Sequence, residues 1–154
     1  MNLTLPITDI EPLLPHSGDM VLLDEITEFT PDFIVAKTTI KPDNILIKNN
    51  ILTTFSAIEI MAQAIGAYAG IQNKLQGLPV KLGYLLGSRN LEIFSEQIPI
   101  GTTLEIQAKV SITDSLGFSI FECQLMDDST QKILLKGALN VFSPDEEINL
   151  IKKG

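Results

Sequence analysis

The hydrophobic positions of the chain change their period along its length. From residue 53 to residue 71 they fall on every side of a helix, whereas before and after that segment they alternate with polar residues. Residues typical of turns, such as Gly, Pro, Asn and Asp, separate the alternating runs. The pattern therefore predicts strands at 21–29, 33–40, 80–94, 103–113, 118–126 and 133–142, a short helical turn at 8–14 and a loop at 41–50.

Two strands, one long helix and four strands are typical of an α+β domain. A helix that is apolar all round must be covered, so we expect it to lie along a curved antiparallel sheet of about six strands. A second subunit would then cover the remaining flank, which predicts a dimer, with the two sheets joined edge to edge. The 154 residues match a single domain, with a core at about 8–142 and a charged tail from about 145.

Two polar residues, Glu59 and Gln63, lie within the apolar helical segment. They are four residues apart and therefore share one face of a helix. A carboxyl buried there without a partner either costs several kcal/mol or keeps its proton, which is the condition of a catalytic acid or base. The alternative is a structural carboxyl that a neighbouring segment satisfies. Thr53 or Thr54 is expected to cap the helix and to leave free main-chain N–H groups at its start.

The composition excludes several classes of function. A formal charge of −8 and an isoelectric point near 4.5 argue against nucleic acid or an anionic membrane as a partner. The polar pair and the lack of flanking basic residues argue against a membrane span. The only cysteine, Cys123, excludes an internal disulfide and a cysteine-based metal site, and its apolar neighbours in the sequence favour burial. No secretory signal pattern is present, so a cytoplasmic location is expected.

Two motifs carry a resemblance to a known family. Residues 14–20 read Leu-Pro-His-Ser-Gly-Asp-Met, and residues 58–63 read Ile-Glu-Ile-Met-Ala-Gln. Together with the order of elements, they resemble the hot-dog-fold 3-hydroxyacyl-acyl carrier protein dehydratases over about residues 8–142. The stretch Gly-Tyr-Leu-Leu-Gly-Ser-Arg at 83–89 is most similar to the aryl polyene branch of that family. The resemblance implies a hot-dog homodimer in fatty acid or polyene lipid synthesis, acting on thioesters of acyl carrier protein or coenzyme A.

The sequence departs from the fatty-acid-synthesis branch at one point. In that branch the catalytic histidine lies in a loop just before the hot-dog helix, whereas residues 41–52 of this chain contain no histidine. His16 is the only histidine present. Either His16 supplies the base from another position, across the dimer interface as the resemblance implies, or the dehydratase chemistry is lost. Apart from the resemblance, the ring of His16 also suits a turn cap bonded to the main chain.

Dehydration of a 3-hydroxyacyl thioester to a trans-2-enoyl thioester requires three contributions. A base takes the C2 proton, donors stabilise charge on the thioester oxygen, and an acid protonates the hydroxyl leaving C3. We expect neutral His16 as the base, protonated Glu59 as the acid, and Gln63 as the residue that orients Glu59. The N–H groups at the helix start are candidate donors to the thioester oxygen. No metal or organic cofactor is needed.

Three further residues are candidates for substrate binding. Arg89, the only arginine, is expected to contact the phosphopantetheine arm of the carrier or, alternatively, to form an ion pair with a nearby carboxylate. Gly83 and Gly87 allow an acyl chain to approach closely or, alternatively, mark strand irregularities.

Two other functions remain open. In a hot-dog thioesterase, Glu59 would activate or hold a water that attacks the thioester carbonyl, and no loop histidine would be required. In a non-catalytic partner subunit, the chain would bind acyl groups or stabilise a second dehydratase subunit.

Overall fold

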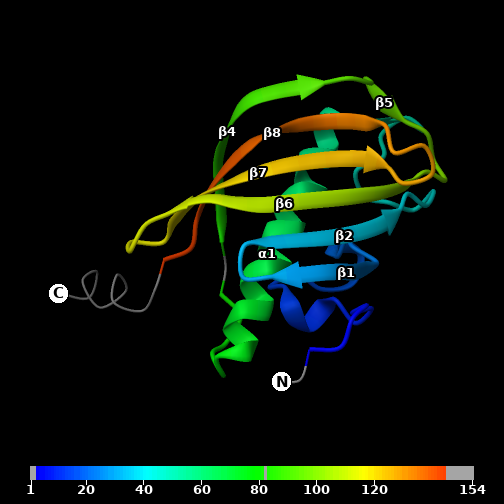
Figure 1. Ribbon diagram of the computed structural model, residues 1–154. Coiled ribbons are helices and arrows are strands. Elements are labelled where there is room, and N and C mark those ends of the chain that lie inside the picture. Colours follow the sequence, from blue (N-terminus) through cyan, green and yellow to red (C-terminus); the bar gives the residue numbers. More distant parts are fainter. Residues whose placement is uncertain (1–2, 82, 145–154) are drawn as a thin grey trace.

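The computed structural model describes residues 3–81 and 83–144. Figure 1 shows one long helix against a six-stranded antiparallel sheet. The expected α+β arrangement, a central helix on a curved sheet, is therefore confirmed. The helix is α1 (Ile58–Leu75), and the strands in sheet order are β1 (Glu25–Thr30), β2 (Phe33–Thr39), β6 (Thr103–Thr113), β7 (Phe118–Asp127), β8 (Ile133–Phe142) and β4 (Tyr84–Ile93).

Short turns join most neighbouring strands of the sheet. Pro31 and Asp32 form the turn between β1 and β2. Between β6 and β7, the carboxylate of Asp114 accepts hydrogen bonds from the main-chain N–H groups of Leu116 and Phe118, at 2.8 and 3.0 Å. β2 and β6 are paired across a long insertion, which contains α1 and β4, and β4 pairs with β8 across β6 and β7. This insertion places the helix against one face of the sheet.

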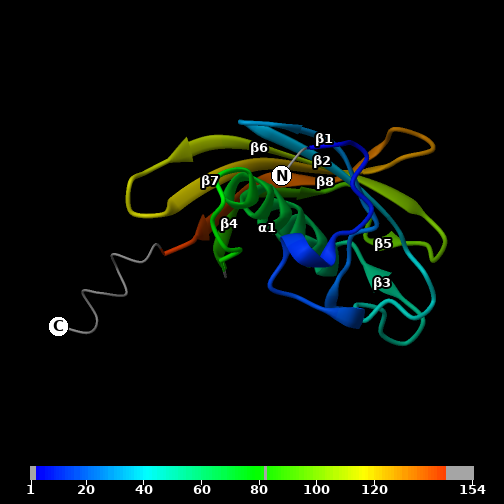
Figure 2. The ribbon, with the colours of Figure 1, turned by 90° about the horizontal axis from the view of Figure 1, so that it is seen from below.

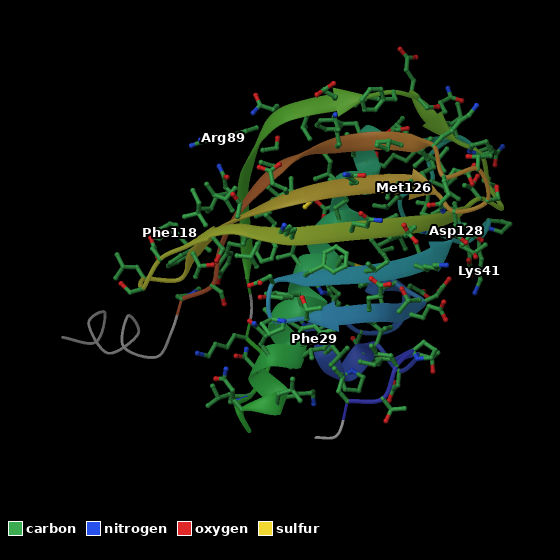
Figure 3. The ribbon with its side chains drawn as sticks, viewed as in Figure 1. Phe29, Lys41, Arg89, Phe118, Met126 and Asp128 are labelled. Atoms are coloured by element: carbon green, nitrogen blue, oxygen red, sulfur yellow. The ribbon has the colours of Figure 1, made fainter. Side chains whose placement is uncertain are left out.

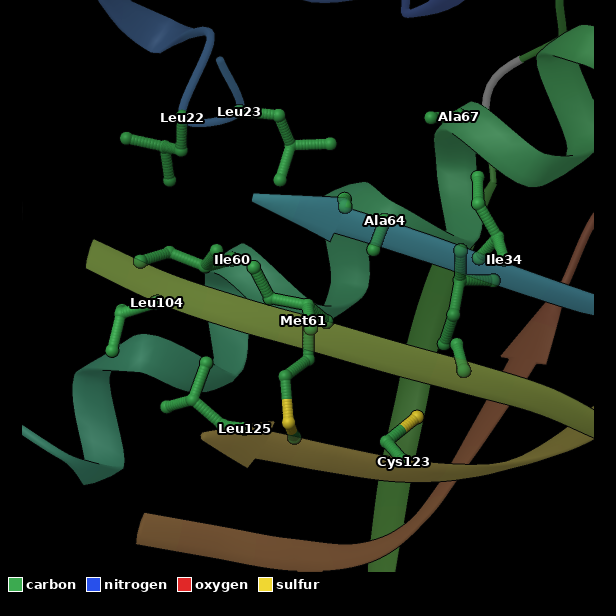
Figure 4. Packing of buried hydrophobic residues seen from close by; sticks show 14 of the residues in the cluster. Leu22, Leu23, Ile34, Ile60, Met61, Ala64, Ala67, Leu104, Cys123 and Leu125 are labelled. Carbon is green, nitrogen blue, oxygen red and sulfur yellow. The ribbon is translucent and has the colours of Figure 1, made fainter. Parts of the chain in front are cut away.

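The helix α1 buries most of its sides against that face (Figure 2). It packs chiefly on β2, β6 and β7, and Ile60, Met61 and Ile71 are fully buried. Burying a side chain of this size stabilises the fold by about 1.5–3 kcal/mol relative to leaving it exposed. In Figure 4, Met61 points toward β7, the strand that carries Leu125 and Cys123. The main hydrophobic core therefore lies between α1 and the middle of the sheet.

One flank of α1 is only partly covered, although we expected the helix to be surrounded. Ala62, Gly66 and Ala69 are half-buried and follow the exposed Glu59 at helical spacing. The edge strand β4 also leaves apolar side chains exposed, namely Tyr84, Leu85 and Leu86. A second subunit over this flank and edge stays a prediction.

Several boundaries differ from those predicted, for local reasons. β1 begins at Glu25 rather than at residue 21, because the N–H of Leu22 donates to the side chain of Gln63 instead of a strand neighbour. The turn expected at 8–14 is a shorter 3-10 turn at Glu11–Leu13, with Pro12 as its second residue. β4 begins at Tyr84 rather than at residue 80.

Two short strands were not predicted, β3 (Leu52–Thr53) and β5 (Gln97–Ile98), which pair with each other. A strand of two residues is too short to show an alternation of apolar and polar positions in the sequence. The predicted charged tail from about 145 lies outside the described residues.

Candidate active site

A cavity of about 650 Å³ runs along the partly covered flank of α1. Its walls come from the helix, from the N-terminal segment, from the start of β4 and from β6, β7 and β8. Four of the predicted site residues line it: His16, Glu59, Gln63 and Gly83. The fold therefore brings the only imidazole and the carboxyl of the helix to one cavity, although they are distant in the sequence.

Glu59 is exposed in the single chain, not buried as we expected. It is the second residue of α1 and lies on the partly covered flank. No hydrogen bond or ion pair joins its carboxyl to another residue that the structure describes. The expectation was wrong for the single chain because apolar residues all round a helix do not show which of its flanks the rest of the chain leaves uncovered.

His16 is half-buried, and its Nδ1 atom is buried with no hydrogen-bond partner among residues 3–81 and 83–144. A turn cap would require the ring to bond the main chain, and the described part of the chain contains no such bond. A buried polar atom without a partner costs about 1–3 kcal/mol. Such an atom calls for an explanation, and a bound substrate or a second subunit would supply one.

Gln63 does not orient Glu59, which corrects our expectation. Its side chain is 6% exposed and turns to the N-terminal segment instead. Its Oε1 accepts a hydrogen bond from the main-chain N–H of Leu22 at 2.8 Å, and its Nε2 donates to the carbonyl oxygen of Met20 at 2.6 Å. Two unpaired main-chain groups attract the amide more strongly than an exposed carboxyl does.

The N–H groups at the start of the helix are largely occupied, so they do not form the expected free site for a thioester oxygen. A 3-10 turn (Phe55–Ala57) precedes α1. The N–H of Thr54 donates to the carbonyl of Glu96 at 2.9 Å, and that of Ser56 donates to Oγ1 of Thr53 at 3.2 Å. The N-terminal cap of α1 itself is Ala57, and no side chain caps it, so the expected cap by Thr53 or Thr54 is wrong. Thr53 bonds the turn that precedes the helix instead.

The remaining candidates lie in β4 or directly before it. Gly83 lines the cavity, whereas Gly87 lies where the pairing of β4 with β8 shifts register, so a strand irregularity at Gly87 is confirmed. Arg89 is exposed and points outward from β4 (Figure 3). It forms no ion pair with a described residue and lies outside the cavity wall. Its contact with a carrier stays a prediction.

Sequence reasoning missed the polar residues at the other end of the cavity. The hydroxyl of Tyr68 donates to the carbonyl of Pro31, and Nε2 of Gln72 donates to the Tyr68 oxygen at 2.9 Å. Burial raises the pKa of Tyr68, and the charge of nearby Asp32 adds to this effect. Lys81 also lines the cavity. One feature of the sequence could have revealed this pair: Tyr68 and Gln72 are four residues apart and therefore share one face of the helix.

Comparison with known proteins now decides the family. The profile of the ApeP-like family, described as ApeP dehydratase, matches residues 8–152. The chain belongs to the ApeP-like dehydratase family. This ApeP-like chain is 30% identical to a chain of the dehydratase heterocomplex ApeI:P from Xenorhabdus doucetiae, with a TM-score of 0.82 over 97% of this chain and 99% of that chain. No curated protein matches the chain.

More distant structures share the fold alone. The PaaI protein from the phenylacetic acid degradation operon of E. coli is 14% identical, with a TM-score of 0.58 over 76% of this chain and 80% of that chain. A hypothetical thioesterase with coenzyme A from Streptococcus pneumoniae TIGR4 is 12% identical, with a TM-score of 0.59 over 77% of this chain and 84% of that chain. The ApeP-like chain therefore has the hot-dog fold. Within the described residues, no helix has the length and apolar character needed to cross a bilayer.

Proposed function

We propose that this ApeP-like chain removes water from 3-hydroxyacyl thioesters, with His16 as the base and Glu59 as the acid. One observation carries the proposal: the only imidazole and the helix carboxyl line the same cavity of a chain that belongs to a dehydratase family. The unpaired Nδ1 atom of His16 adds to it, because a ring held without a partner retains its capacity to bond substrate.

The proton transfers of the proposed elimination pass through these two groups. Neutral His16 takes a proton from C2, and the electron pair of that C–H bond forms the double bond between C2 and C3. The C3–O bond breaks as the carboxylic acid of Glu59 gives its proton to the leaving hydroxyl, so that one water departs. The proton on His16 then passes to the Glu59 carboxylate, directly or through water, and both groups return to their starting states.

A second subunit is part of the proposal. Glu59 is exposed in the single chain, and the acid role requires its carboxyl to act in a site from which water is excluded. The partly covered flank of α1 and the exposed apolar residues of β4 lie where a second copy would achieve this. We therefore propose a homodimer or a larger assembly as the active form.

The small residues of α1 suit the acyl chain. From Glu59 to Gln72, the cavity follows α1 for about 20 Å at 1.5 Å per residue. Ala62, Gly66 and Ala69 lie along this path and leave room beside the helix. The thioester end would lie near His16 and Glu59, with the acyl chain directed along the helix.

Arg89 is the proposed contact for the carrier. Its exposed guanidinium on β4 can bind the phosphate of a phosphopantetheine arm or of coenzyme A. The variant Arg89→Gln should raise KM for the carrier-bound substrate and leave kcat unchanged. An unchanged KM with both the carrier protein and the coenzyme A substrate would show that Arg89 does not contact the phosphopantetheine arm.

Mass spectrometry of the substrate tests the proposed reaction. The purified chain is incubated with a 3-hydroxyacyl thioester of acyl carrier protein, and in parallel with the coenzyme A thioester. Loss of one water from the acyl group supports the dehydratase. Release of free acid would instead show the thioesterase that the sequence left open.

A non-catalytic partner role is the second candidate. The related chain from Xenorhabdus doucetiae belongs to a dehydratase heterocomplex, and residues 41–52 of this chain lack the loop histidine. In this case the chain alone leaves the substrate mass unchanged. Adding it to a second dehydratase subunit then raises that subunit's rate or stability, and the variant His16→Ala does so equally well.

A further inference from the structure

We infer that Gln63 is a positioning residue that holds the segment around His16, residues 14–22, on α1. Its buried amide bonds two main-chain groups of that segment, the carbonyl of Met20 and the N–H of Leu22. These groups lie only a few residues beyond His16. The amide thereby takes the place of a neighbouring strand, since it offers one donor and one acceptor to an extended stretch of chain.

The other side of the segment is held by the same helix. Leu14 packs on Gly66, where an added Cβ would lie 3.4 Å from its Cδ2 atom. Leu13 lies against Gly70 even more closely. The segment that carries His16 is therefore attached to α1 before the histidine by packing and after it by the Gln63 amide.

One element, α1, therefore positions both members of the proposed acid–base pair, His16 and Glu59. Glu59 projects from α1 itself, and Gln63, one turn later, holds the segment that brings His16 to the cavity. The expected effect of Gln63 on the dehydration rate rests on the proposed function, whereas its expected effect on the position of His16 does not.

The variant Gln63→Glu tests the inference because its shape is nearly that of glutamine. When protonated, the new carboxyl accepts from Leu22 and donates to Met20, as the amide does. When ionised, it faces the Met20 carbonyl with no proton between the two oxygens, so the segment is released. Gln63→Met, of similar volume, removes both hydrogen bonds at every pH.

The first measurement is the dehydration rate of Gln63→Glu divided by that of the wild type, between about pH 5 and about pH 9, a range that covers the titration of a buried carboxyl. The ratio is expected to be near one at the acid end and to fall about tenfold as the new carboxyl ionises, which corresponds to about 1.4 kcal/mol. The ionisable residues that line the cavity are present in both proteins: His16, Asp32, Glu59, Tyr68, Lys81 and Tyr84. The uncharged variant Gln63→Met separates the loss of the two hydrogen bonds from any effect of the new charge on these residues.

Gln76→Glu is the matched control. It makes the same change on the same helix, at the exposed C-terminal end of α1, and should keep a constant ratio. A constant ratio for Gln63→Glu, or a Gln63→Met protein as active as the wild type, would overturn the inference.

The second measurement does not depend on activity. Because His16 is the only histidine, its ring gives a single, unambiguous set of NMR signals. In Gln63→Glu these signals should match the wild type at acid pH and diverge as the carboxyl ionises. Signals that follow the wild type at every pH would overturn the inference. If the wild type shows no dehydration at all, the proposed function fails, and this measurement alone decides the role of Gln63.

Discussion

Gly70 of α1 lies directly against the main-chain carbonyl of Leu13, so a side chain on Gly70 would overlap that oxygen. This contact packs the 3-10 turn Glu11–Leu13 against the helix. It also begins the segment that leads to His16. The close approach of helix and main chain therefore requires glycine at this position.

Replacing Gly70 by alanine should destabilise the protein by about 1–3 kcal/mol, because backbone must move to admit the methyl group. The control is Gly66→Ala, one turn earlier, where the methyl would meet only the flexible end of Leu14 at 3.4 Å. Alanine is about 1 kcal/mol better than glycine inside a helix, so this variant should be neutral or more stable. Urea unfolding of both variants checks the prediction, and equal midpoints would contradict it.

The sole cysteine should be unreactive in the folded protein. Burial raises the pKa of Cys123 to about 12, and the charge of Glu122 adds to this effect. The thiolate is the reactive form, so little of it is present near pH 8. Iodoacetamide should therefore modify the native protein far more slowly than the protein in urea. Equal rates in the two conditions, followed by mass, would show that the strand carrying Cys123 is open to solvent.

Dimerisation should depend on the exposed apolar residues of β4. Leu86 is 56% exposed at this sheet edge. A lysine there would place a charge in the expected interface, so Leu86→Lys should shift the protein toward monomer. Leu116→Lys is the control, because Leu116 is 59% exposed in the turn between β6 and β7 and is not part of the edge strand β4. Sedimentation velocity over a range of concentrations measures both variants, and a monomeric wild type would contradict the dimer.

The long elements could be predicted from the sequence because their hydrophobic periods are sustained. β6, β7 and β8 match the predicted ranges to within a residue or two, and the apolar segment from residue 53 contains most of α1. The start of β1 could not be predicted, because the pairing of Leu22 with Gln63 is a contact between distant segments. The two-residue strands β3 and β5 depend in the same way on tertiary pairing.

Two members of the candidate site were predictable from the sequence, whereas their contacts were not. His16 and Glu59 stood out as the only histidine and the only charged residue of the apolar segment, and both line the cavity. The exposure of Glu59 could not be read from the sequence, since a flank that faces a second subunit has the same composition as one that faces the core. The partners of Gln63 were likewise hidden, because a main-chain carbonyl and N–H carry no sequence signature.

The most direct test of the central claim is the initial rate of water loss from a 3-hydroxyacyl thioester, measured for the wild type, His16→Ala, Glu59→Gln and the double variant. If the two groups act as one acid–base pair, each single change should lower kcat/KM by about 100-fold or more. The double variant should then be little slower than the worse single variant, because residues that act as a unit are not additive. Full rate in either single variant, or no rate in the wild type, would contradict the account.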